Sequence, residues 1–130
     1  MIKQDYLMAM IESFFKAIAR VLKFKSNLPK PEIEKQLDDI YSEFLKNNRE
    51  FFLSNDLNGI ISTFSSNDRM VKLNMLSEIL YRELELFNLP ERNKELALKL
   101  IDLYDYINEN SKEYSIEREF RRSEIQKFIE

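Results

Sequence analysis

The chain has 130 residues, of which 44% are apolar and 33% are charged, and its formal net charge is -3 at pH 7. It is too apolar for a disordered chain and too polar for a membrane-embedded one, so the composition predicts a soluble folded protein. Cys and His are both absent, which removes disulfides, zinc-finger ligands, thiolate nucleophiles and the usual general base. The single glycine, Gly59, excludes glycine-rich phosphate loops and favours helices over tight hairpins.

The first residues do not resemble a targeting segment. Asp5 and Glu12 interrupt the apolar positions, and no small-residue cleavage site follows, so we expect no signal peptide. No uncharged apolar stretch approaches the ~18 residues of a membrane helix. The net negative charge also argues against a general nucleic-acid binder. We therefore expect a cytoplasmic protein.

The first predicted helix, over residues 5–24, has an unusually wide apolar surface. At 100° per residue its apolar side chains cover roughly 200° of the circumference, against the ~100° of an ordinary surface helix. The opposite side carries the charged residues Asp5, Glu12, Lys16, Arg20 and Lys23. Acids precede bases, which suits the helix dipole.

Three interpretations of this wide apolar surface compete. The helix is wedged between two layers of its own domain, or one of its edges pairs with another chain, or it lies on a membrane. The edge in question carries Met8, Phe15 and Leu22. The membrane interpretation suffers from a polar face with few basic residues, where anionic lipid would favour more.

The rest of the chain also shows helical periodicity. Pro31 suits the first position of a second helix, and Asn47 or Asn48 would end it. An apolar knot at 51–53 precedes a brief helix capped by Ser54 or Asn55, although a short strand is an alternative there. The brief helix is predicted over 57–64, further helices over 69–87 and 91–108, and a last one after a cap at Asn110 or Ser111 that ends near 129.

Five or six helices joined by short loops predict an all-α fold of antiparallel neighbours, as a bundle or as tetratricopeptide-like helical hairpins. No linker divides the chain, so a single helical domain over 1–130 is expected. Alignment of Ala97 with the central small residue of the tetratricopeptide pattern places Tyr81, Leu84 and Ile101 favourably, but Glu85 and Glu109 do not fit, and no second copy follows.

The opening QDYLMAMIESFFKAIARVL is more specific. It resembles the start of a family of small uncharacterised bacterial proteins that begin with a QDYLMxMIE-type helix. The matching residues are Gln4, Asp5, Tyr6, Leu7, Met10, Ile11 and Glu12, with a second similar stretch at Tyr114, Ser115, Glu117 and Arg118, and a looser match in FFLSNDLNGIISTFSSN. The resemblance implies a wholly helical, tetratricopeptide-like fold and implies no activity.

A group of acidic residues was considered as a cation site because carboxylate oxygens suit hard cations. It consists of Asp38, Asp39 and Glu43. The alternative is a solvated acidic helix face, which we favour because di-iron and di-manganese bundles add a Glu-x-x-His pair and this chain has no histidine. We predict no metal and no cofactor.

A basic cluster near the carboxyl end suggests an anion clamp, because guanidinium groups bind oxygen pairs. It consists of Arg118, Arg121, Arg122 and Lys127. The favoured alternative is that Glu117, Glu119 and Glu124 neutralise these cations along an exposed helix.

No hydroxyl has a visible activating partner, so catalysis is not expected. The sequence instead predicts a non-enzymatic protein-protein interaction or scaffold module. Its partner, an unidentified protein or a second copy of the chain, would cover Met8, Phe15 and Leu22, while Glu12 and Arg20 select orientation. The alternatives are a membrane-surface helical protein and an enzyme that uses only carboxylate, Arg and Tyr groups.

Overall fold

A computed structural model describes the backbone over residues 2–87 and 90–129 and the side chains over 5–87 and 93–129. This part of the chain forms seven helices and no strand. The predicted all-α class is therefore confirmed. The helix count exceeds the predicted five or six because one segment expected to be irregular is helical.

The chain divides into two compact units, residues 1–55 and 56–130. The boundary falls within the polar segment between two short helices, where neither Pro nor Gly marks a linker. Each unit has its own buried apolar side chains.

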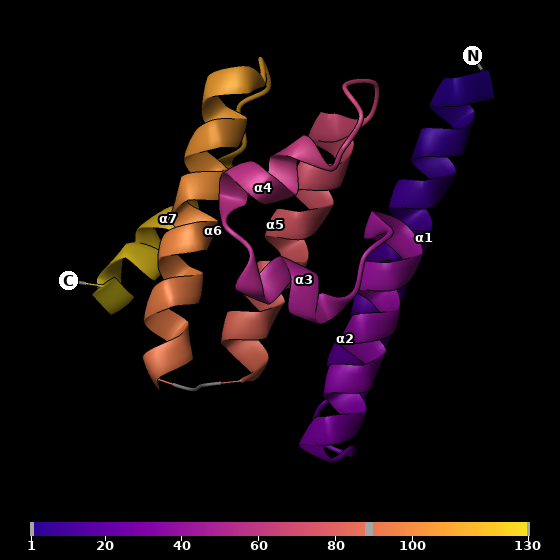
Figure 1. The fold of residues 1–130 in the computed structure, drawn as a ribbon. Coiled ribbons are helices and arrows are strands. Elements are labelled where there is room, and N and C mark those ends of the chain that lie inside the picture. Colours follow the sequence, from indigo (N-terminus) through magenta and orange to yellow (C-terminus); the bar gives the residue numbers. More distant parts are fainter. Residues whose placement is uncertain (1, 88–89, 130) are drawn as a thin grey trace. The chain divides into compact units, whose positions relative to one another are not determined.

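The first unit is a helical hairpin with a short third helix. Helix α1 (Ile2–Phe24) runs antiparallel to α2 (Lys30–Leu45), and α3 (Arg49–Ser54) packs on α2 (Figure 1). Pro31 lies in the first turn of α2, where its missing N–H needs no acceptor. Lys46 ends the helix with a left-handed backbone, at φ 61°. The buried side chains of the hairpin are Phe14, Ile18, Val21, Ile33, Leu37, Ile40, Tyr41, Phe44 and Leu45.

Helix α3 forms where the sequence predicted only a short apolar cluster at residues 51–53. Asn48, expected to end the second helix, instead begins the third, because its side-chain Oδ1 accepts a hydrogen bond of 2.8 Å from the backbone N–H of Phe51. Phe52 is buried, and its ring stacks on Tyr41 with centroids 5.3 Å apart. The cap and this ring contact explain why so short a segment is helical.

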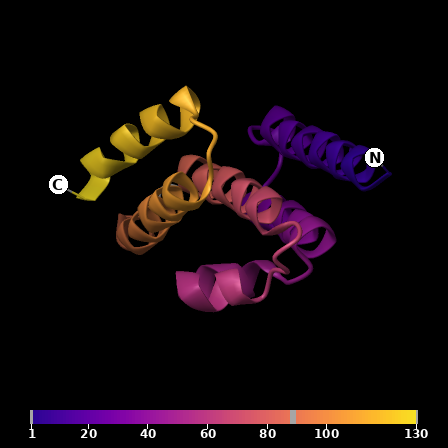
Figure 2. The same ribbon diagram turned by 90° about the horizontal axis from the view of Figure 1, so that it is seen from above.

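The second unit contains α4 (Leu57–Ser62), α5 (Arg69–Leu86), α6 (Pro90–Asn110) and α7 (Ile116–Ile129). Helix α6 packs on the other three, and α5 runs antiparallel to it (Figures 1 and 2). The apolar core of the second unit includes Leu73, Leu76, Leu80, Leu100, Leu103 and Ile107.

Helix α4 confirms the brief helix predicted at this place and excludes the strand alternative. Its cap is Asp56 rather than Ser54 or Asn55, because Asp56 Oδ1 accepts a 2.8 Å hydrogen bond from Gly59 N–H. A Cβ on Gly59 would lie 2.9 Å from that same oxygen. The glycine therefore leaves room for the cap.

The last helix begins later than predicted. Ser115, not Asn110 or Ser111, accepts a hydrogen bond from the backbone N–H of Arg118, while the Asn110 side chain bonds back to the Tyr106 carbonyl. The sequence also predicts that Asn88-Leu89-Pro90 stops the helix over 69–87; residues 88 and 89 lie outside the described part of the structure. None of the described helices combines the length and apolar character needed to cross a bilayer.

We predict that Asn48→Ala lowers the free energy of unfolding by about 1 kcal/mol, because the amide cap of α3 is lost. The neighbouring Asn47→Ala is the matched control, since Asn47 does not cap α3. Urea unfolding followed by circular dichroism measures both. Equal effects of the two substitutions would contradict the capping role.

Candidate interaction surface

One edge of α1 leaves large apolar side chains in solvent. Met8 is 60% exposed and Phe15 is 48% exposed, while Leu22 on the same edge is half-buried. These three residues are seven positions apart, so they form a stripe along the helix. We call this stripe the Phe15 edge.

The Phe15 edge is held by aromatic packing beneath it. The ring of Phe15 contacts Phe14 edge to face at 5.3 Å, and Phe14 contacts Phe44 of α2 in the same manner at 5.5 Å. Edge-to-face pairs at these distances are favourable. Phe15 is therefore an exposed aromatic ring supported by a rigid base.

The other edge of the apolar surface of α1 is also exposed. It carries Tyr6 and Phe24, and the Lys23 ammonium lies 5.7 Å from the Phe24 ring centroid. The buried stripe of α1 between these two edges consists of Phe14, Ile18 and Val21. Unit 1 alone thus does not enclose α1 between two layers.

Helix α2 shows the opposite behaviour, since each of its large apolar side chains is buried. A two-helix hairpin has a single contact face, and α2 matches its apolar width to that face. The apolar surface that the hairpin contact leaves unburied therefore lies on α1.

Charged residues border the Phe15 edge unequally. At 100° per residue, Glu12 projects about 60° from Phe15, and Asp5 and Lys23 project about 80° from it. Arg20 projects about 140° from Phe15, on the flank nearer Tyr6 and Phe24. Glu12 and Arg20, both predicted as orienting charges, therefore lie on different flanks of the helix; both are exposed.

The acidic residues considered as a cation site do not converge. Asp38 accepts a 2.8 Å hydrogen bond from the backbone N–H of Arg49, and Glu34 forms a 3.0 Å ion pair with the same residue. Asp39 and Glu43 are exposed. Within the described residues, no three side chains of metal-binding type come together. An open pocket lies beside Arg49, at the junction of α2 and α3.

The basic cluster of α7 is largely neutralised by other helices. Arg118 is buried and donates to Asn108 Oδ1 at 2.7 Å and to the Glu113 carbonyl. Arg122 forms a two-bond pair with Asp105, at 2.8 and 3.2 Å. The predicted pairing along α7 itself accounts for only two contacts, Arg121 with Glu117 and Lys127 with Glu124. The arginines fasten α7 to the unit, which leaves little capacity for an anion.

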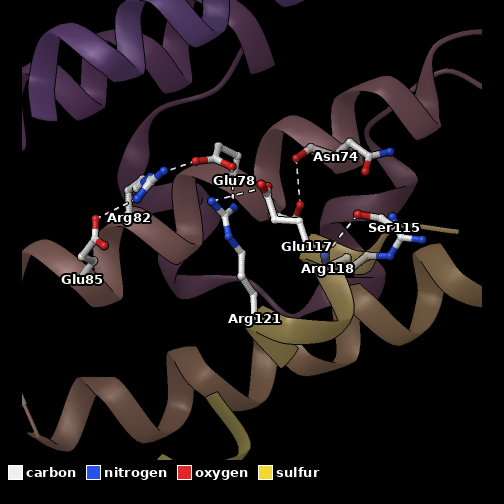
Figure 3. Close-up of polar contacts among 9 residues, drawn as sticks. Asn74, Glu78, Arg82, Glu85, Ser115, Glu117, Arg118 and Arg121 are labelled. Carbon is white, nitrogen blue, oxygen red and sulfur yellow. Dashed lines mark hydrogen bonds and ion pairs between the residues drawn. The ribbon is translucent and has the colours of Figure 1, made fainter. Parts of the chain in front are cut away.

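Arg121 makes the most buried of these contacts. Figure 3 shows it and Arg82 both directed at Glu78, with N–O distances of 2.6 and 2.8 Å. The Arg121 guanidinium also lies 4.2 Å from the Tyr81 ring centroid. Burial alone would lower the pKa of Arg121, but the hydrogen bond and the charge of Glu78 outweigh it and raise that pKa.

Tyr104 lies beside this ion pair. Its side chain is 2% exposed, and its hydroxyl has no hydrogen-bond partner among the described residues. Burial raises the pKa of Tyr104 well above its usual value, against the opposing charge of Arg121. Sequence reasoning missed both Tyr104 and Glu78, because Tyr104 fits an apolar stripe and Glu78 resembles an ordinary helix partner of Arg82. Arg121, the partner of Glu78, lies on a helix distant in the sequence, so the spacing of neighbouring residues does not indicate this pair.

No protein-family model, no curated protein and no solved structure matches the chain. The resemblance of the opening helix to a bacterial family stays a prediction.

We predict that Arg121→Met lowers the free energy of unfolding by about 2 kcal/mol, because Glu78 would remain buried with only Arg82 to compensate its charge. Lys127→Met is the matched control: its pair with Glu124 is exposed, so the expected loss is below about 0.5 kcal/mol. Urea unfolding measures both. A similar small loss for the two variants would show that the Glu78 pair does not fasten α7.

We predict that Tyr104 makes the protein less stable in strong alkali. Its folded-state pKa is raised, so above about pH 10 the unfolded chain releases this proton while the folded chain keeps it. The free energy of unfolding then falls by at most about 1.4 kcal/mol per pH unit.

Tyr104→Phe removes this contribution, and at pH 7 it is neutral or stabilising because the lost hydroxyl had no partner. The measurement is urea unfolding of both proteins between pH 7 and 11. A difference between them that stays constant across this range would contradict the prediction.

Proposed function

We propose that this chain is a non-enzymatic helical module that binds another protein surface through the Phe15 edge of α1. Met8, Phe15 and Leu22 supply the apolar contact, while Glu12 beside this edge and Arg20 on the other flank of α1 select orientation. The occupant is a helix, because a stripe of side chains seven residues apart matches the groove between side chains of a neighbouring helix. We place the module in the cytoplasm.

One observation carries the proposal: the large apolar side chains of Met8 and Phe15 are exposed to solvent, and the Phe15 ring packs on the buried ring of Phe14. Burial of about 25 cal/mol per Å² of apolar surface makes such side chains favourable contact points, and a rigid aromatic loses little conformational entropy on binding. Interface centres are enriched in residues of this kind.

The charge on α1 favours a protein over a membrane as the occupant. Glu12 and Asp5 border the Phe15 edge together with Lys23, whereas a helix on anionic lipid has mainly basic borders. The arginines of α7 already bind Asn108, Asp105 and Glu78. The arginines that an enzymatic alternative would use thus have structural partners. We further propose that the helix pairs of the second unit resemble tetratricopeptide hairpins.

The test places a photoreactive phenylalanine analogue at position 15 and, as a matched control, at Phe120, a 61% exposed aromatic of the second unit. Irradiation in the native cells is followed by mass analysis of covalent adducts. We expect a protein adduct from position 15, and we expect the added substitution Leu22→Ala to reduce its yield by about tenfold, as loss of a buried contact of 1 to 2 kcal/mol would do.

Circular dichroism checks that the fold survives in each variant. Lipid adducts would support the membrane alternative instead. The proposal fails if position 15 yields no protein adduct, or if Phe15→Ala combined with Leu22→Ala leaves self-association and partner capture unchanged while the fold is intact.

A further inference from the structure

We infer that the occupant of the Phe15 edge is α1 of a second copy of this chain, in antiparallel orientation. This inference rests on the proposed function and adds the identity and direction of the bound helix. It follows from the positions of the apolar and charged residues along α1.

The apolar residues of the edge are symmetric about Phe15. Met8 and Leu22 lie seven positions before and after it. When two copies of α1 cross antiparallel at Phe15, Met8 of each copy therefore lies at the level of Leu22 of the other, and the two Phe15 rings meet at the two-fold axis. Such an isologous contact needs one surface that complements itself.

The charges obey the same symmetry. In this arrangement Asp5 lies within two residues of the level of Lys23 of the second copy, and Glu12 lies equally close to Lys16 of the second copy. Both pairs are of opposite charge, and all four residues are exposed. A parallel pairing would instead set Asp5 at the level of Asp5 and Lys23 at the level of Lys23, so neither pair of opposite charges would form.

The hairpin itself favours this arrangement. Helices α1 and α2 form one layer, and the Phe15 edge is open. Two such hairpins joined through α1 make a four-helix bundle, in which each α1 contacts two helices. A helix between two long neighbouring helices requires an apolar surface wider than one stripe, and α1 has that width.

The experiment uses charge reversal at Asp5 and Lys23. These residues are about 27 Å apart along the same helix, so any energetic coupling between them must be intermolecular. The dissociation constant of the full chain is measured by sedimentation for wild type, Asp5→Lys, Lys23→Asp and the double variant. Lys112→Glu, which reverses an exposed charge outside α1, is the matched control.

We expect each single reversal at Asp5 or Lys23 to weaken self-association about fivefold, since each turns two attractive exposed pairs into repulsive ones. The double variant restores opposite charges across the contact and returns to within about twofold of wild type. An equimolar mixture of the two single variants also associates, because each supplies what the other lacks. Lys112→Glu leaves the dissociation constant unchanged.

The outcomes separate this inference from the proposed function. Single reversals without effect, or a double variant as weak as the single ones, overturn the antiparallel second copy. An adduct from position 15 to a different protein, with a monomeric purified chain, overturns the inference and leaves the proposed function intact. An intramolecular adduct from position 15, or no adduct at all, overturns both the inference and the proposed function.

Discussion

The main physical constraint on this structure is how much of the apolar surface of α1 is buried away from water. Burying the middle stripe, with Phe14, Ile18 and Val21, holds the hairpin together. The same helix carries apolar residues on both sides of that stripe, and Met8 and Phe15 remain exposed. A hairpin of two helices has no third surface to offer them. The free energy available from covering the Phe15 edge is the physical basis of the proposed function.

The two units are stabilised in different ways. In the first, stacked and edge-to-face rings connect the three helices, from Phe15 to Phe44 and from Tyr41 to Phe52. In the second, α7 buries Ile125 but is attached mainly through Arg118, Arg121 and Arg122. Charge-assisted hydrogen bonds are directional and fix the register of a helix more sharply than apolar contact does. The basic cluster is thus part of the architecture.

Sequence periodicity was sufficient for the long helices and for the wide apolar surface of α1, because a 3.6-residue period is a local property. It did not predict α3, whose six residues are too few for a period and whose helix depends on the Asn48 cap and on Phe52 meeting Tyr41. It placed the start of α7 too early because Asn110, Ser111 and Ser115 are equally suitable caps by type. The pairing of Arg121 with Glu78, 43 positions away, leaves no trace in local spacing.

Oxidation of methionines tests most directly whether the Phe15 edge is covered. Met8 lies on this edge at 60% exposure, and Met75 is buried at 2% exposure, so one chain carries both the probe and its reference. Peroxide treatment of the dilute purified chain is compared with treatment of intact native cells. The account predicts rapid oxidation of Met8 in dilute solution and strong protection in cells, with Met75 slow in both. Equal reactivity of Met8 in the two settings would contradict it.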